Sequence, residues 1–174
     1  PKNISNASIN DRAISKTNQQ KGLFRFCGRD LYFYLSMGLF SSFDIDTGTK
    51  HLLRTLSENI DFSSIHHLLD SGCGTGVIAV SLKKAYSPVS IDALDRDSLA
   101  LEMTSENAKL NNTEISVFPG LDILAIQPQL PDSPFMHSKK YDLITTNIPA
   151  KAGLPVLRRF MQNGLASLSD DGHF

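Results

Sequence analysis

The feature that most constrains this chain is a glycine-rich segment, LLDSGCGTGVIAV, which joins an apolar run to a helix-like run. Gly72, Gly74 and Gly76 stand at alternate positions in it. Glycine lets the backbone turn sharply and lets another molecule approach without a Cβ in the way. A helix that follows such a loop begins with free N–H groups. The segment therefore predicts a strand, an open loop and a helix in immediate succession.

Strand-like and helix-like runs alternate on both sides of this loop. Apolar runs predict strands at 64–70, 89–95, 115–118 and 141–147. Amphipathic runs predict helices at 49–58, directly after Gly76, at 98–110 and at 155–168. This alternation predicts an α/β fold, a Rossmann-like three-layer sandwich with a mostly parallel sheet.

The two ends of the chain differ from this central pattern. Residues 1–22 are polar and predict an N-terminal arm. Aromatic-rich runs on either side of Gly28-Arg29-Asp30 predict a β-hairpin, and we assign 23–48 to this hairpin and a loop that covers the ligand site. The main domain is expected at 49–174. A turn at Asp171-Gly172 and a strand start at His173-Phe174 indicate a sheet truncated at its fifth strand, so we expect a fragment of a longer domain.

Composition and charge exclude several classes of protein. The net charge of −1 gives no global basic field for nucleic acid, so an RNA substrate would need a local basic patch. Cys27 and Cys73 stand in unrelated contexts, which predicts neither a disulfide framework nor a metal site and fits a reducing compartment. No apolar run reaches the length of a membrane span. We therefore expect a cytoplasmic protein with neither a membrane nor a metal partner.

Acidic residues at three successive strand ends restrict the kinds of ligand that the glycine loop can bind. The order here is G-x-G-x-G followed by Val77, so the dinucleotide fingerprint G-x-G-x-x-G is not met in register. Asp70 would repel a pyrophosphate and favours a cationic or amino-bearing ligand. Asp95 can take both hydroxyls of a ribose, and Asp122 can accept from an adenine amino group. Together they indicate an adenosine pocket without a phosphate partner.

Two other interpretations of the loop stay open at this point. The glycines could serve only to pack the strand tightly against the helix. The chain could also be a nicotinamide-dependent oxidoreductase, against which the glycine register speaks.

Three blocks resemble the class I S-adenosylmethionine-dependent methyltransferases, and more narrowly the small-domain family that includes ribosomal-RNA guanine-N2 methyltransferases. GLFSSFDIDTGTKHLL is similar to the family's lead-in, and LLDSGCGTGVIAV to its cofactor loop. TTNIPAKAG resembles its Asn-Pro-Pro-aromatic motif. The resemblance covers residues 38–174 and implies S-adenosylmethionine as cofactor.

The resemblance also implies roles for individual residues. Asp70 and Gly72 would face the methionine end of the cofactor, and Asp95 would hold the ribose. Phe40 and Thr49 would help to close the pocket. The other residues implied to bind cofactor are Cys73, Gly74, Gly76, Arg96, Asp122, Ile123 and Asn147, and those implied to be catalytic are Asn147, Ile148 and Pro149.

The implied chemistry is methylation of an amino group. The Asn147 side-chain oxygen and the Ile148 carbonyl would accept its N–H bonds and stabilise the charge that develops on nitrogen. The structural alternative for Asn147 is a turn residue before a proline. Ile148 and Ala150 depart from the family's proline and aromatic, and Ala150 cannot stack on a planar base. The methyl acceptor (RNA, protein or small molecule) therefore stays open, and the alternative function is a catalytically inactive S-adenosylmethionine-binding partner or scaffold subunit.

Overall fold

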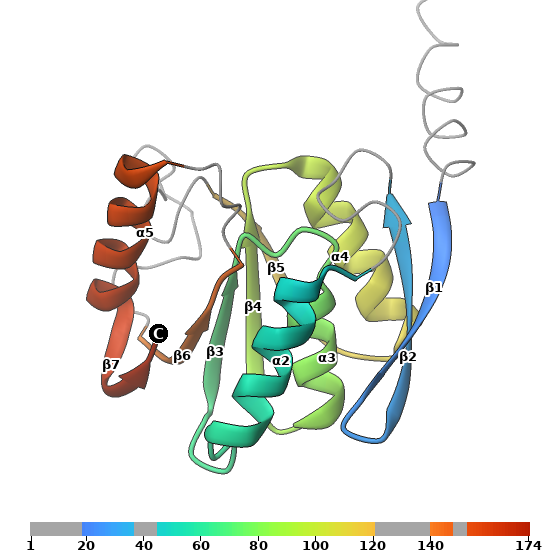
Figure 1. The fold of residues 1–174 in the computed structure, drawn as a ribbon, viewed down its shortest axis with the longest axis horizontal. Helices are drawn as coiled ribbons and strands as arrows, with labels where there is room; N and C mark the ends of the chain where they lie inside the picture. Colours follow the sequence, from blue (N-terminus) through green and yellow to red (C-terminus); the bar gives the residue numbers. More distant parts are fainter. Residues whose placement is uncertain (1–18, 37–44, 121–139, 148–152) are drawn as a thin grey trace, which may run out of the picture.

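A computed structural model describes residues 19–36, 45–120, 140–147 and 153–174 (Figure 1). Within these ranges the chain forms a five-stranded sheet and a separate two-stranded hairpin. The strands of the sheet are β3 (His67–Ser71), β4 (Ser90–Asp95), β5 (Ser116–Pro119), β6 (Tyr141–Thr145) and β7 (Leu168–His173), and those of the hairpin are β1 (Gln19–Phe26) and β2 (Arg29–Ser36). The helices are α2 (Thr47–Asn59), α3 (Val77–Ala85), α4 (Ser98–Leu110) and α5 (Leu154–Ser167).

The order of the strands confirms the predicted Rossmann-like α/β fold. The sheet runs β5-β4-β3-β6-β7, and every neighbouring pair is parallel. The chain moves outward from β3 to β5 and then crosses back to β6 on the other side of β3. The strand order therefore reverses between β3 and β6. In open α/β sheets ligands bind beyond the carboxyl ends of the strands at such a switch point.

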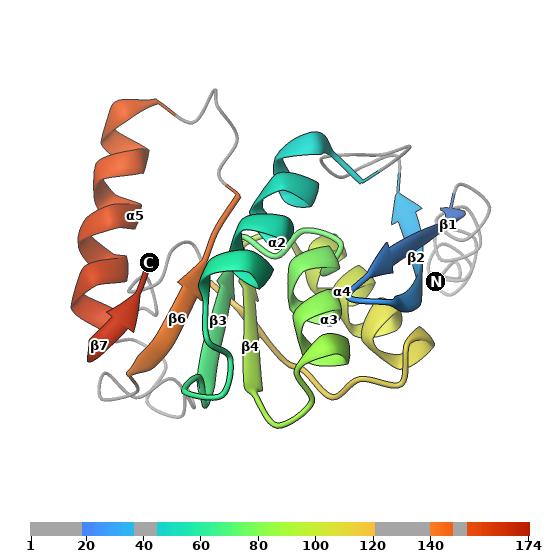
Figure 2. The same ribbon diagram turned by 60° about the horizontal axis from the view of Figure 1, so that its bottom comes forward.

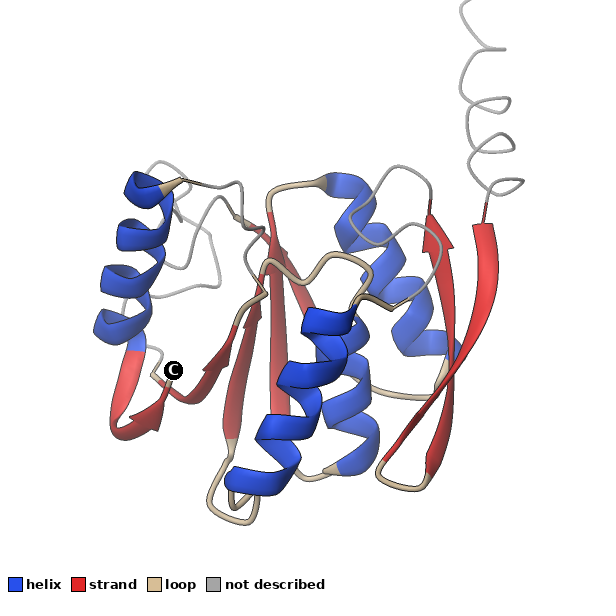
Figure 3. Cartoon of the chain, viewed as in Figure 1, coloured by secondary structure: helices blue, strands red, loops and turns tan. Residues whose placement is uncertain are grey.

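Side chains that alternate along the strands bury both faces of the sheet. Leu68 and Leu143 belong to the large core cluster beneath α2, α3 and the hairpin. The next residues along, Leu69 and Ile144, belong to a second buried cluster on the opposite face. Figure 2 shows α3 between α2 and α4, and Figure 3 shows α5 beside β6 and β7, at the far end of the sheet from the hairpin. The sheet is thus apolar on both sides, as a layered α/β domain requires.

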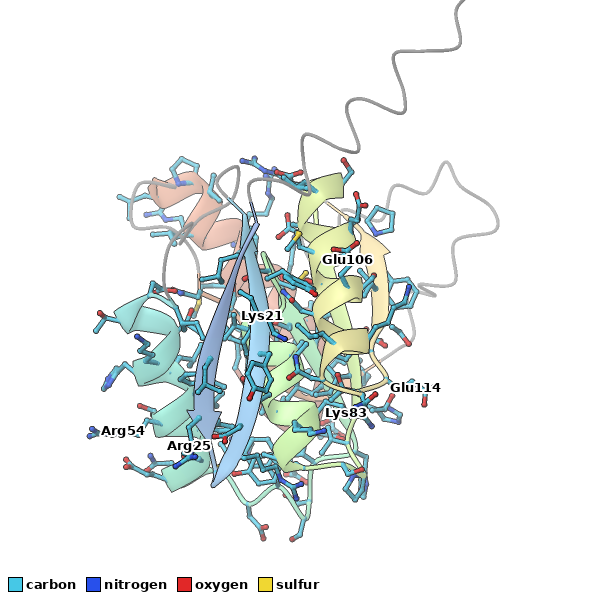
Figure 4. The ribbon with its side chains drawn as sticks, turned by 90° about the vertical axis from the view of Figure 1, so that its right-hand side faces the viewer. Lys21, Arg25, Arg54, Lys83, Glu106 and Glu114 are labelled. Atoms are coloured by element: carbon cyan, nitrogen blue, oxygen red, sulfur yellow. The ribbon has the colours of Figure 1, made fainter. Side chains whose placement is uncertain are left out.

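Asn107 of α4 and Asn111, the C-cap of that helix, hold the hairpin against the main domain. Asn107 accepts from the Tyr34 N–H at 2.7 Å and donates to the Tyr34 carbonyl at 3.0 Å. One turn later, Asn111 makes the equivalent pair with Tyr32, at 2.9 and 2.7 Å. Their amides therefore satisfy the outer edge of β2 as a neighbouring strand would. Lys21 and Arg25 lie on the exposed face of the hairpin, which is turned away from the main domain (Figure 4).

Replacing Asn107 with alanine should destabilise the protein by about 1–3 kcal/mol. Asn107 is fully buried, so its loss leaves the Tyr34 backbone groups and the Thr75 carbonyl without their partner. Urea unfolding measures the change. Glu102→Ala is the control, because Glu102 is an exposed residue of the same helix. Equal stabilities for the two variants would contradict the prediction.

The start of the hairpin and its turn both differ from those predicted from the sequence. β1 begins at Gln19, inside the polar segment that was expected to be an arm. The turn is Cys27-Gly28 rather than Gly28-Arg29-Asp30, because both residues adopt positive φ, at 47° and 71°. A two-residue turn with two positive φ angles matches the twist of a hairpin. It also places Arg25 opposite Asp30, and the two side chains form a salt bridge at 2.7 Å.

The fifth strand of the sheet begins earlier than predicted. β7 starts at Leu168 rather than at His173, and Asp171-Gly172 lies within it instead of forming a separate turn. The strand pairs with β6 through a register irregularity, with Leu168 opposite Tyr141 and His173 opposite Leu143. A Cβ on Gly172 would lie 2.9 Å from the Tyr141 carbonyl oxygen, so only glycine fits this close approach. The Asp-Gly signal therefore marks an irregular strand.

Candidate functional site

The loop after β3 provides an open cradle at the switch point. Gly72 and Gly74 have φ angles of 78° and 56°, which favour glycine. The N–H groups of Gly72 and Cys73 both donate to the Leu94 carbonyl, at 2.7 and 3.0 Å, and so fasten the loop to the end of β4. Among the residues that the structure describes, a Cβ added at Gly72 or Gly74 would meet nothing within 4 Å. The described residues therefore hold the backbone from below and leave its upper side accessible to a ligand.

Helix α4 supports the same loop from the side. Thr104 donates to the Gly74 carbonyl at 3.1 Å, and Asn107 donates to the Thr75 carbonyl at 2.8 Å. Gly76 (φ 77°) packs so closely that a Cβ would lie 2.9 Å from two side-chain atoms of Thr104. Neither Thr104 nor Asn107 was predicted from the sequence as part of the site. Their signal was two polar residues, three positions apart, on the otherwise apolar face of α4.

Asp70 lies at the end of β3, fully buried beneath the loop. Its carboxylate accepts from the Ala79 N–H at 3.1 Å and from the Thr145 hydroxyl at 3.4 Å. Burial raises the pKa of Asp70 to about 7, the charge of Asp95 adds to this rise, and the two hydrogen bonds oppose it. A positively charged ligand group near Asp70 would relieve the cost of its ionisation.

Stability should fall as pH rises through the range in which Asp70 ionises. The pKa is raised in the folded state, so the unfolded chain loses this proton first, between its ordinary value of 3.8 and about 7. From pH 5 to pH 8 this one group should lower the free energy of unfolding by about 2–3 kcal/mol. Urea unfolding across this range should show the decrease in the unmodified chain and lose it in Asp70→Asn. Asp61→Asn is the control, because the pKa of the exposed Asp61 is lowered.

Asp95, at the end of β4, helps to shape the loop. Its two carboxylate oxygens accept from the Gly74 N–H at 2.9 Å and the Asp97 N–H at 3.0 Å. Each carboxylate oxygen has a second lone pair, so these bonds leave acceptor capacity for ligand hydroxyls. Arg96, the next residue, is exposed. Asp95 thus joins the glycine loop to the end of the neighbouring strand.

Asn147, just after β6, meets the beginning of α2. Its side-chain Nδ2 donates to the Thr49 hydroxyl oxygen at 2.9 Å and lies 3.3 and 3.4 Å from the two carboxylate oxygens of Asp46. Asp46 is the N-cap of α2 and accepts from the Thr49 N–H at 3.0 Å. Figure 1 shows the beginning of α2 at the same edge of the molecule as the loop after β3. Thr49 was expected to help close the pocket, whereas Asp46 was not predicted as a site residue.

Neither cysteine takes part in a disulfide or in a metal-binding cluster of the described residues. Cys27 is exposed, Cys73 is buried, and both are free thiols. Burial, together with the charge of Asp70, raises the pKa of Cys73 far above its usual value. The described residues contain no group of three or more His, Cys, Asp or Glu side chains that could hold a metal ion. None of the helices that the structure describes is long and apolar enough to span a bilayer.

Several residues singled out from the sequence lie outside the described part of the chain. These are the two predicted adenine contacts, two members of the predicted catalytic motif, the residue expected to help close the pocket, and the residue at the position of the family's aromatic. They are Asp122, Ile123, Ile148, Pro149, Phe40 and Ala150. The structure brings the remaining predicted residues, around Asp70, Asp95 and Asn147, to one edge of the sheet.

The family of the chain follows from a match over most of its length. The family model described as the methyltransferase small domain matches residues 30–174. The chain belongs to this family. The expected class I methyltransferase fold is thereby confirmed, and the chain is a methyltransferase small domain of the class that uses S-adenosylmethionine.

Individual relatives of this methyltransferase small domain are larger or uncharacterised proteins. The ribosomal RNA small subunit methyltransferase C of Hahella chejuensis is 34% identical over 130 residues, covering 74% of this chain and 33% of that protein. The uncharacterized protein YbxB of Bacillus subtilis is 28% identical, covering 90% of this chain and 73% of its own length. The chain thus spans about a third of the first relative.

A solved structure shares the fold. The T. thermophilus 16S rRNA N2 G1207 methyltransferase, in complex with AdoMet and guanosine, has a TM-score of 0.72 at 21% identity. The match covers 88% of this chain and 40% of that one. At this identity the likeness shows the fold, and roles for individual residues must come from the geometry of this chain.

Proposed function

We propose that this methyltransferase small domain binds S-adenosylmethionine at the carboxyl edge of its sheet and methylates an amino group on an RNA base. The observation that carries the proposal is the orientation of Asn147. Its Nδ2 is engaged by Thr49 and Asp46, so its Oδ1 is left to accept a hydrogen bond. An acceptor oxygen beside an open cofactor loop is what an N–H-bearing substrate needs.

The residues at this edge fit the cofactor. Gly72 and Gly74 have no described residue within 4 Å of the position of a Cβ, which suits the close approach of a bulky ligand. Asp70, fully buried beneath the loop, would attract a cationic group through its charge when ionised, and Asp95 offers a carboxylate to ribose hydroxyls. When bound, S-adenosylmethionine supplies a methyl group on a sulfonium, already activated for in-line displacement.

The residues of the chain have to position the acceptor and stabilise charge. The Asn147 Oδ1 accepts one N–H of the target amine, which turns the nitrogen lone pair out of conjugation and toward the methyl group. The same oxygen stabilises the positive charge that develops on nitrogen. The Ile148 carbonyl is the proposed second acceptor. This mechanism requires neither a nucleophilic side chain nor a metal.

Support for an RNA base as acceptor comes from relatives. The Hahella chejuensis relative is named for methylation of ribosomal RNA, and the T. thermophilus structure contains guanosine, whose N2 is an exocyclic amine. The chain itself carries a net charge of −1, so contact with RNA would depend on local basic groups or on a larger assembly.

Calorimetry of the full chain with S-adenosylmethionine is the first test, and failure to bind at millimolar cofactor would overturn the proposal. The second test is transfer of a labelled methyl group to total RNA, with a protein extract and small amines as parallel acceptors. Label on a nucleobase amine, located by mass spectrometry, is the expected result. Binding with no transfer to any acceptor would instead support a catalytically inactive cofactor-binding subunit.

A further inference from the structure

At the beginning of α2, the side chains of Asp46 and Thr49 meet that of Asn147, which comes from a distant part of the chain. The Thr49 hydroxyl donates to the Asp46 Oδ2 at 2.6 Å. The Thr49 oxygen in turn accepts from the Asn147 Nδ2 at 2.9 Å. Asn147 lies 98 residues from Thr49 and 101 from Asp46. Thr49 is buried, whereas Asp46 and Asn147 are half-buried. The tertiary fold thus assembles a continuous chain of hydrogen bonds.

The chemistry of these groups allows only one direction for the bonds. Partial burial acts to raise the pKa of Asp46, but hydrogen bonds from Thr49, Asn147 and the Gly48 N–H together hold that pKa below its usual value. The carboxylate is therefore ionised near neutral pH and can only accept. The single proton of the Thr49 hydroxyl must then point to Asp46. The Thr49 oxygen can consequently only accept from Asn147, so a donor must face it.

We propose that Asp46 and Thr49 are positioning residues that hold the Asn147 amide with Nδ2 inward and Oδ1 outward, and so select a methyl acceptor that carries N–H protons. This inference rests on the proposed function. With the amide turned by 180°, its NH₂ group would face the substrate and could not accept a hydrogen bond from the substrate N–H. The unflipped amide offers an oxygen that only a donor can use.

Gly48 adds a steric element to the same arrangement. A Cβ at this position would lie 2.9 Å from the Asp46 Oδ1 and 3.4 Å from the Asn147 Oδ1. The absence of a side chain therefore leaves Oδ1 approachable from the α2 side and keeps the Asp46 carboxylate in place. Among the described residues, none donates a hydrogen bond to this oxygen. Within the described part of the chain, this oxygen thus keeps an acceptor position that a substrate can use.

Thr49→Val tests the inference, because valine keeps the shape of threonine and the N-cap bond from the backbone of residue 49. We expect kcat for amine methylation to fall about 10-fold or more, with the Kd for S-adenosylmethionine within about threefold. Thr49→Ser, which restores the hydroxyl, should recover most of the rate. Thr47→Val is the matched control, because Thr47 is an exposed threonine in the same first turn.

Asp46→Ser separates helix capping from orientation, since serine is also a favoured N-cap but is too short to hold the Thr49 hydroxyl. It should lose rate like Thr49→Val while the melting temperature stays near that of the unmodified chain. Rates for Thr49→Val and Asp46→Ser equal to those of Thr47→Val would overturn the inference.

A readout without catalysis keeps this inference distinct from the proposed function. In ¹⁵N spectra, the Asn147 side-chain NH₂ should exchange slowly with solvent in the unmodified chain and in Thr47→Val, and rapidly in Thr49→Val. Rapid exchange in the unmodified chain would overturn the orientation directly. Failure of the proposed function has a different signature, in which the NH₂ group is protected but the unmodified chain transfers no methyl group.

Discussion

Replacing Asn147 with alanine should reduce kcat for methyl transfer by about 10²–10³-fold, the effect seen when one preorganised hydrogen-bond partner of a transition state is removed. The affinity for S-adenosylmethionine should change little, because Asp70, Asp95 and the glycine loop remain. Single-turnover methyl transfer and calorimetry separate the two quantities. Asn147 is only half-buried, so the variant should fold normally.

Asn59→Ala provides the matched control for this prediction. Asn59 is an exposed asparagine at the opposite end of α2, where its side chain donates to the Thr55 carbonyl at 2.8 Å. It should transfer methyl groups at the rate of the unmodified chain. If Asn147→Ala also kept a rate within about threefold of it, the turn-residue interpretation of Asn147 would be correct and its acceptor role wrong.

Gly76→Ala should destabilise the protein by about 2–5 kcal/mol and weaken cofactor binding. Two effects add at this position. The backbone φ of 77° is unfavourable for an L side chain, and the new Cβ would lie 2.9 Å from Thr104 side-chain atoms and 3.0 Å from the Thr104 Cα. Because the Cα cannot move without α4, the loop and the helix would have to separate. Urea unfolding and calorimetry with S-adenosylmethionine measure the two consequences.

Gly74→Ala is the control variant that has the same backbone strain without the clash, so the difference between the two variants measures the clash. Gly74 also has a positive φ, of 56°, but a Cβ there would meet none of the described residues within 4 Å. In this variant the free energy of unfolding should fall by only about 1–2 kcal/mol, the cost of the backbone conformation alone. A loss in Gly74→Ala as large as that in Gly76→Ala would mean that packing against α4 contributes nothing to the loop.

The sequence correctly predicted those helices and strands whose ends are set by residues close to them in the chain. The helix expected at 98–110 has those limits in the structure, because Asp97 caps its start and the apolar spacing continues to its end. The parallel sheet followed from the alternation of strands and helices. The strand β7 was misplaced, because its irregular pairing with β6 depends on the close approach of Gly172 to Tyr141, which no local pattern reports.

The glycine loop, its difference from the dinucleotide fingerprint, and the acids Asp70 and Asp95 at neighbouring strand ends could all be predicted from the sequence alone. These are properties of residues a few positions apart, whose conformation and charge are set by their own chemistry. The protonation of Asp70 and the orientation of Asn147, in contrast, depend on the tertiary structure. Burial by the whole domain raises the pKa of Asp70 to about 7. The crossing of the chain at the β3–β6 switch point brings Asn147 to Thr49 and Asp46, and no spacing in the sequence encodes that meeting.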